Sequence, residues 1–222
     1  MLFKQFWGDD KAEKLKGPTY IKFLYGHLVE ALVIALTRAA GHEVTEQQKE
    51  CEVEGVKGHL DCYIDGTLVD VKSASSYGFK KFLHGTLHKD DPFGYIPQLK
   101  AYAYSEKQTK YGWLALDKSN GALAYLEYDE ENPGDYAEAI DWDVPERVLE
   151  VKKLMEGELP SVCYPDVPDG KSGNRKLSMG CTFCEFKHSC WPELRRFSYS
   201  NGDKYLTLVD KTPRVKEMPE GF

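Results

Sequence analysis

The sequence predicts an α/β protein with a central mixed β-sheet flanked by helices, followed by a C-terminal lobe rich in cysteine. Helical and strand-like patterns alternate through the first two thirds of the chain, which is typical of an α/β core. Four of the six cysteines lie in the last third instead. With 222 residues, the chain is long enough for one domain and a small appendage.

The first predicted element is a long helix over residues 18–40. Apolar residues recur there at helical spacing, as at Leu24, Leu28 and Leu32, and Gly41 provides a stop. We expect this helix to be largely buried in the core.

Three short strands are predicted next, near residues 50–56, 59–65 and 67–73. The last two are joined by Asp65 and Gly66, a favoured two-residue hairpin turn. This turn fixes which residues of the two strands face each other.

The remaining elements complete the predicted core. We expect a helix over 91–108, a hairpin over 111–129 that turns at residues 119–121, and a helix over 144–157. The predicted organisation is a core over residues 1–160, a cysteine-rich, metal-bound lobe over 161–199 packed on that core, and a tail over 200–222.

The hairpin over residues 58–73 carries charged residues within strand-like sequence. With the predicted turn, Asp61 lies directly opposite Asp70, and cross-strand partners share a face. Lys72 shares this face because side chains alternate along a strand. The opposite face then carries an apolar set: Leu60, Cys62, Ile64, Val69 and Val71.

Two opposed carboxylates repel each other, so Asp61 and Asp70 would destabilise the hairpin unless a cation lies between them. Mg²⁺ and Mn²⁺ prefer carboxylate oxygens together with water. Lys72 could then orient or help deprotonate an attacking water, or stabilise charge on a phosphate. The alternative is an exposed hairpin face on which Lys72 only neutralises the acids.

The same residues carry a family resemblance. A strand ending in Asp61, a turn and then "DVK" at Asp70 and Lys72 resemble the PD-(D/E)XK nuclease superfamily. The resemblance implies a restriction-endonuclease-like core, with these residues as its two acids and its lysine.

Two further motifs are similar to the RecB-like exonuclease branch, which includes CRISPR-associated RecB-like and phage-type iron–sulfur exonucleases. "GHLVE" matches a helix-borne histidine at His27, with Glu30 one turn later, and "QLKAYAY" matches a Q-x-x-x-Y motif at Gln98 and Tyr102. Taken singly, each has a structural alternative: a hydrogen-bonded core histidine, a helix-stabilising glutamate, or half-buried helix residues.

The resemblance also implies a ligand set. His27, Asp61, Asp70 and the backbone carbonyl of Val71 would hold one or two Mg²⁺ or Mn²⁺ ions. The residues implied to act in catalysis are His27, Glu30, Asp61, Asp70, Lys72, Gln98 and Tyr102.

The cysteines of the last third form a second candidate site. Cys181, Cys184 and Cys190 have the spacing of ligands to one ion or cluster, and a cluster in a reducing compartment indicates metal before disulfides. The RecB-like branch implies a structural [4Fe–4S] cluster. Zn²⁺ is the alternative, bound by four cysteines or by three with His188.

The fourth cluster ligand is expected to be Cys163, which precedes the other three in a predicted loop. Cys51 and Cys62 lie in predicted strands and have better core interpretations. The chain departs here from many members of the branch, in which the first ligand precedes the histidine motif.

Aromatic and basic residues surround the cysteines. They could guide a DNA strand or pack the lobe, and we favour packing for Phe183 and Trp191. The set is Phe183, Phe186, Lys187, Trp191, Arg195 and Arg196.

The sequence thus predicts a metal-dependent exonuclease that acts on single- or double-stranded DNA with an end, and the resemblance places such enzymes in phage or mobile-element DNA processing and recombination. A non-catalytic DNA- or partner-binding module and a structure-specific endonuclease are the alternatives. Self-association or a recombination or replication partner is compatible with either. We expect a cytoplasmic protein without a membrane-spanning run, and the net charge of −7 argues against binding by general electrostatics.

Overall fold

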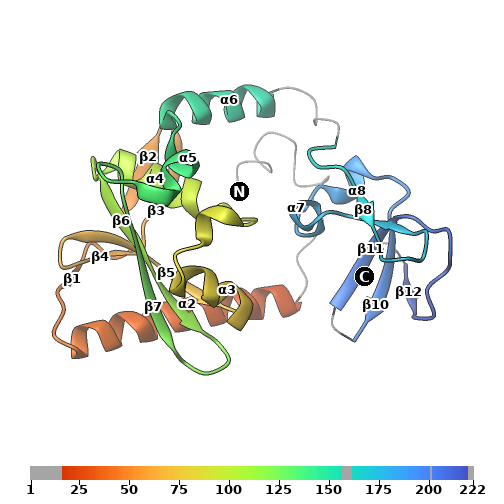
Figure 1. The fold of residues 1–222 in the computed structure, drawn as a ribbon, viewed down its shortest axis with the longest axis horizontal. Helices are drawn as coiled ribbons and strands as arrows, with labels where there is room; N and C mark the ends of the chain where they lie inside the picture. The colour runs from red at the N-terminus through yellow and green to blue at the C-terminus, as the bar shows by residue number, and fades with distance from the viewer. Residues whose placement is uncertain (1–16, 157–161, 201, 220–222) are drawn as a thin grey trace. The chain divides into compact units, whose positions relative to one another are not determined.

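The computed structural model describes residues 17–156, 162–200 and 202–219 (Figure 1). The described residues divide into two compact units, an N-terminal unit up to residue 151 and a C-terminal unit from residue 152. The boundary near residue 151 lies before the one expected at residue 160.

The N-terminal unit is built on a mixed five-stranded sheet. Its spatial order is β1 (Val44–Thr45), β4 (Cys62–Ile64), β5 (Thr67–Ala74), β6 (Lys110–Asp117) and β7 (Leu123–Asp129). β5 pairs with β6 in parallel, and the other neighbours are antiparallel. The predicted α/β class with a mixed, helix-flanked sheet is therefore confirmed.

Helices lie on both faces of this sheet. Helix α2 (Gly17–Ala39) packs on one face (Figure 1). The connection from β5 to β6 supplies helices to the other face, namely α3 (Ser76–Leu83), the 3₁₀ turn η1 (Leu87–Lys89) and α4 (Tyr95–Ser105). After β7 come η2 (Gly134–Tyr136), α5 (Ala137–Ile140) and α6 (Val144–Glu156).

The predicted hairpin register is confirmed over β4 and β5, but Asp61 lies just outside β4, so the expected cross-strand pair of Asp61 with Asp70 is not part of the ladder. Asp65 and Gly66 have φ of 48° and 83°, as a type I′ turn requires, and Ile64 pairs with Thr67. Cys62 consequently pairs with Val69.

Two predicted boundaries are wrong, both because of turn residues. The strand expected over 50–56 is instead a separate hairpin, β2 (Glu50–Val53) and β3 (Val56–His59), which reverses at a positive-φ pair, Glu54 and Gly55. The helix expected over 91–108 begins only at Tyr95, where Asp91 accepts hydrogen bonds from the first free backbone N–H groups.

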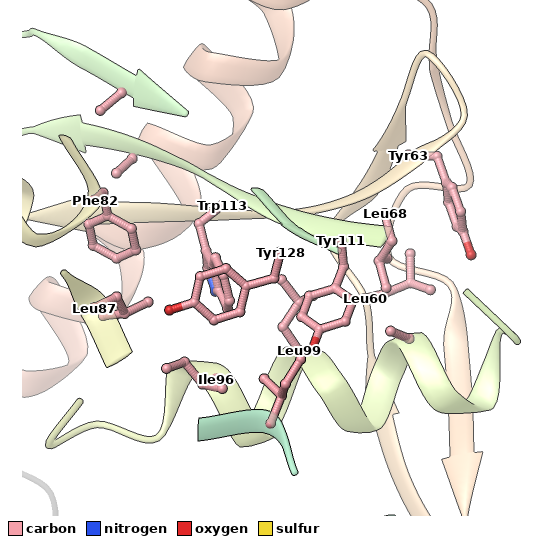
Figure 2. Close-up of a cluster of buried hydrophobic side chains, with 14 of the residues drawn as sticks. Leu60, Tyr63, Leu68, Phe82, Leu87, Ile96, Leu99, Tyr111, Trp113 and Tyr128 are labelled. Carbon is pink, nitrogen blue, oxygen red and sulfur yellow. The ribbon is translucent and has the colours of Figure 1, made fainter. Parts of the chain in front are cut away.

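The larger core of the N-terminal unit lies between the sheet and α4. Figure 2 shows Ile96 and Leu99 of α4 pointing toward aromatic rings carried by β6 and β7. The rings of Trp113 and Tyr128 meet edge to face, with centroids 4.9 Å apart. This packing fixes α4 against the strands and so places the α4 residues discussed below.

Helix α2 is less buried than the sequence predicts. Val33 and Ile34 pack under the sheet, whereas Leu28 and Leu32 are 60% and 51% exposed. Because the helix is apolar around its whole circumference, periodicity could not identify the inward side. Over Thr19–Ala39 it is also long and apolar enough to cross a membrane by length and composition, contrary to expectation, but its inner face belongs to the core.

The C-terminal unit contains a second five-stranded sheet. Its order is β12 (Glu217–Met218), β10 (Arg195–Tyr199), β11 (Gly202–Leu208), β9 (Arg175–Lys176) and β8 (Val167–Pro168). The short helices α7 (Met179–Thr182) and α8 (Lys187–Cys190) carry Cys181 and Cys190, and Cys184 lies in the connection between them. The expected tail over 200–222 is thus partly a component of this sheet, since β11 and β12 flank β10.

Candidate active site

Strand β5 carries a buried acid and a lysine that contact each other. Asp70 is only 3% exposed, and the Lys72 Nζ lies 2.9 Å from its Oδ1 and 2.7 Å from its Oδ2. Both residues share the sheet face with the α4 core, as their spacing predicts. The alternative of an exposed hairpin face is therefore wrong.

The Oδ2 atom of Asp70 is incompletely satisfied. The nearby Lys72 Nζ makes an ion pair with it, but within the described residues no donor has hydrogen-bond geometry toward it. The ammonium group of Lys72 compensates the negative charge of Asp70, but its direction from Oδ2 leaves the lone pairs of this oxygen without a hydrogen bond. A buried carboxylate oxygen in this state is suited to an additional cationic ligand.

Lys72 is held in its charged form. Burial alone would lower the pKa of its ammonium group, but the charge and hydrogen bond of Asp70 outweigh this, so the pKa is raised. A lysine that retains its proton stabilises negative charge or orients a neighbour.

Asp61 reaches this pair from the connection between β3 and β4. Its Oδ2 accepts a hydrogen bond of 2.7 Å from the backbone N–H of Val71. The side chain thus occupies a position where a longer β4 would have continued its ladder with β5. Because the chain is not a strand at residues 60–61, Leu60 lies in the α4 core rather than on the face of Cys62, as was expected.

The environment of Asp61 disfavours its charged form. Burial is the main cause, followed by the negative charge of Asp70, and together they raise the pKa of the Asp61 carboxyl to about 7. Burial likewise raises the pKa of Asp70. The predicted acid pair is therefore close enough to interact.

Helix α2 contributes Glu30 to the same region. The charge of Glu30 raises the pKa of both Asp61 and Asp70, so its carboxylate faces the pair. Its Oε1 accepts a hydrogen bond of 2.7 Å from the Nε2 of Gln48, a residue that carries no motif signal in the sequence. His27 lies outside this group: its side chain is 78% exposed, with Nδ1 3.9 Å from Glu30.

Helix α4 supplies the predicted Gln-Tyr motif. Gln98 Oε1 lies 3.4 Å from the Lys72 Nζ, and Gln98 Nε2 donates to the Tyr102 hydroxyl at 3.2 Å. Tyr95, three residues before Gln98, places its ring centroid 4.9 Å from the same Nζ. Tyr95 was not predicted as a site residue from the sequence, although its spacing of three from Gln98 puts both side chains on the same helix face.

The Tyr102 ring is packed against a glycine of β3. A Cβ atom at Gly58 would lie 2.6 Å from the Tyr102 Cε1. Only glycine permits this approach, so Gly58 is the residue that lets α4 present its motif to Lys72.

The acidic residues fit a divalent cation by their chemistry. Asp61, Asp70 and Glu30 are oxygen ligands, two of them have raised pKa values, and Asp70 Oδ2 has unused lone pairs. The Val71 carbonyl lies on the side of its N–H group, toward Asp61, because both groups of a strand residue point the same way. Within the described ranges, however, no three His, Cys, Asp or Glu side chains already converge on one point.

The charges of the cysteines in the C-terminal unit also raise the pKa values of two of them, as the charges of the acids do in the candidate active site. Burial raises the pKa of Cys190, and so do the charges of Cys184, Cys163 and Cys181. The pKa of Cys184 is also raised, first by burial and then by charges that include Cys181 and Cys163. The four predicted ligands therefore influence one another through their charges, but within the described residues no group of three or more His, Cys, Asp or Glu side chains is placed to hold a metal ion, so the ligand set stays a prediction. Cys51 and Cys62 are buried in the N-terminal unit.

Most neighbours of the cysteines are already engaged within their own unit. Arg195 pairs with Glu217 through two contacts of 2.7 Å, and Arg196 pairs with Asp203. The remaining candidates divide between packing and exposure: Phe186 and Lys187 are buried, Trp191 packs against the small core, and Phe183 is 65% exposed. Trp191 thus packs within its own unit, and the expectation that Phe183 and Trp191 pack the lobe onto the core stays a prediction.

Comparison with known proteins adds no assignment. No model of a known protein family matches this chain, and a search of curated proteins finds no match. What indicates a function in this chain is the grouping of five side chains: Asp61, Asp70, Lys72, Gln98 and Tyr102.

Proposed function

We propose that this chain is a metal-dependent DNA exonuclease with a restriction-endonuclease-like core and a structural [4Fe–4S] cluster, acting in the cytoplasm. The observation that carries the proposal is the buried Asp70, which pairs with Lys72 yet keeps an unsatisfied oxygen beside the protonation-prone Asp61. A purely structural role would not require a buried Asp70 with a second, partly buried acid beside it that repels it.

The roles follow from the positions of the side chains. Asp61 and Asp70, with the Val71 carbonyl and Glu30 close by, would hold Mg²⁺ or Mn²⁺, which supplies Lewis-acid activation of a phosphodiester and of water. His27 would join them only after reorientation, because its ring is largely exposed. Lys72 would donate to the phosphate as negative charge builds on it.

Gln98 and Tyr102 act through Lys72. The hydrogen-bonded series from Tyr102 to Gln98 and on to the Lys72 Nζ restricts where the ammonium group can lie. These two residues are therefore positioning residues for the phosphate-binding cation.

The first test compares linear and covalently closed circular DNA in the presence of Mn²⁺. We expect loss of linear DNA alone, and no loss with Asp70→Asn. Lys57→Ala is a matched control, because Lys57 is an exposed lysine paired with Glu50 on the neighbouring hairpin. Cleavage of closed circles would indicate an endonuclease, and a gel shift without cleavage would indicate a binding module.

Gly58→Ala should lower the rate of cleavage without preventing folding. The added methyl group would displace the Tyr102 ring and disturb the contact of Gln98 with Lys72, at a cost of about 1–3 kcal/mol in stability. Initial rates and thermal unfolding would measure both effects. Gly17→Ala is the control, since a Cβ atom there meets nothing within 4 Å, and an unchanged rate in Gly58→Ala would contradict the role of Tyr102.

Cys163→Ser should reduce bound metal in the C-terminal unit, because Cys163 is the proposed fourth ligand. We expect loss of iron, or of zinc if that ion is bound, together with a lower unfolding temperature. Cys51→Ser is the matched control, because Cys51 is buried in the other unit. Full metal content in Cys163→Ser, measured by elemental analysis, would exclude this ligand.

A further inference from the structure

A cavity of about 210 Å³ lies at the carboxyl ends of the parallel strands β5 and β6. In open α/β sheets, ligands commonly bind outside this end of the strands. We call it the aromatic pocket, and its lining includes Phe82, Leu87, Phe93, Tyr95, Lys81 and Lys118. None of the motifs discussed so far accounts for it.

The aromatic pocket adjoins the candidate active site through Tyr95. This residue is part of the pocket lining, and its ring centroid lies 4.9 Å from the Lys72 Nζ. A ligand that contacts Tyr95 in the pocket would therefore lie next to a residue that also contacts Lys72.

Aromatic rings form one wall of the pocket. Phe93 and Tyr95 are stacked, with centroids 5.6 Å apart and planes inclined by 29°. Phe82 extends this wall, with its centroid 6.1 Å from that of Tyr95. Flat, sequence-tolerant surfaces of this kind bind nucleic-acid bases by stacking.

The charged groups of the pocket are arranged around this wall. Lys81 pairs with Asp90 at 2.6 Å, which neutralises both. Asp91 accepts hydrogen bonds from the first N–H groups of α4, where the helix dipole favours its charge. Lys118, at the end of β6, places a cation at the rim. An uncharged ring can thus enter while a phosphate stays outside.

We propose that the aromatic pocket binds the unpaired terminal base of a DNA strand and thereby sets the adjoining phosphodiester beside Lys72. This inference rests on the proposed nuclease function and adds the part of the substrate that is recognised. The volume lies below the ~300–1,000 Å³ of sites for larger ligands, so it suits one nucleoside and excludes a base pair. The enzyme accordingly requires a frayed or single-stranded end.

The test compares single strands that end in a normal nucleotide with strands that end in an abasic one. Wild-type protein should degrade the abasic-ended strand about ten-fold more slowly, because one stacking interaction is lost. Phe93→Ala should degrade both at the slower rate, whereas Phe93→Tyr, which keeps a ring, should retain the preference. Tyr104→Ala is the matched control, since Tyr104 is a similarly exposed aromatic residue of α4 outside the pocket.

If wild-type protein degrades both strands at equal rates, the proposal that the pocket binds the terminal base is overturned, whereas the nuclease function is not. If neither strand is cleaved, the nuclease function is overturned instead. Binding of the terminal base to the pocket is then measured directly. For that measurement, a terminal 2-aminopurine base is used with Ca²⁺ present. Quenching in wild type and Tyr104→Ala but not in Phe93→Ala supports the pocket, and equal fluorescence in all three overturns it.

Discussion

Lys72→Ala is expected to abolish DNA cleavage and to lower the free energy of unfolding by about 3–5 kcal/mol at pH 8. Asp70 is buried, so removing Lys72 leaves a carboxylate without its counter-charge. Denaturant titration, together with the cleavage assay, would measure both losses.

The pH dependence of this loss identifies its cause. The raised pKa of Asp70 in the folded state means that the variant recovers stability as the pH falls and the carboxyl takes up a proton. The double variant Asp70→Asn/Lys72→Met removes both charges and should regain most of the stability without any cleavage. If the Lys72→Ala protein is as stable as wild type at pH 8, the buried carboxylate of Asp70 does not need the charge of Lys72 for the fold to be stable.

The second large effect is expected when divalent cations are removed. The pKa of Asp61 is about 7 in the folded chain and near 3.9 in an unfolded one, so between these values the folded state binds more protons. The contribution of Asp61 to stability in EDTA should therefore be fully present below about pH 4 and be lost, by roughly 4 kcal/mol in total, as the pH rises from there through 7. Thermal or denaturant unfolding over this range would reveal the slope.

Addition of Mn²⁺ should flatten that slope, because the ion binds the ionised carboxylates and stabilises the folded state by mass action. Asp61→Asn should flatten it without metal, since the amide does not titrate. Asp65→Asn is the control: Asp65 is an exposed turn residue whose pKa is lowered rather than raised, chiefly by a hydrogen bond with His42. If Asp61→Asn keeps the full slope, another group causes it.

The sequence predicted local features of the N-terminal unit well. The Asp65-Gly66 turn determines its own backbone conformation, and the register of β4 and β5 follows from it without reference to distant residues. Gln98 and Tyr102 were identifiable because a spacing of four places them on one helix face.

Features that depend on packing were not predictable in the same way. The exposed leucines of α2 and the burial of Asp70 depend on which surface another element covers, and neither sheet face is evident from β5 alone. Gln48 joins the site only because the chain folds back toward Glu30. His27 matches the motif, but a match in sequence does not determine the direction of the side chain, and here the side chain is largely exposed.

The location of the two acids in different kinds of backbone has a consequence for local motion. Asp70 lies in β5, which is hydrogen-bonded to strands on both sides, so its amide should exchange with solvent only on global unfolding. Asp61 lies in a two-residue connection that is held by the backbone hydrogen bonds of Leu60 to Lys49 and of Gln48 to Asp61, and we expect it to open at a lower free energy than β5. The carboxylate pair would then separate and re-form while the sheet stays folded. The rate at which the connection closes would then limit how fast a cation is captured.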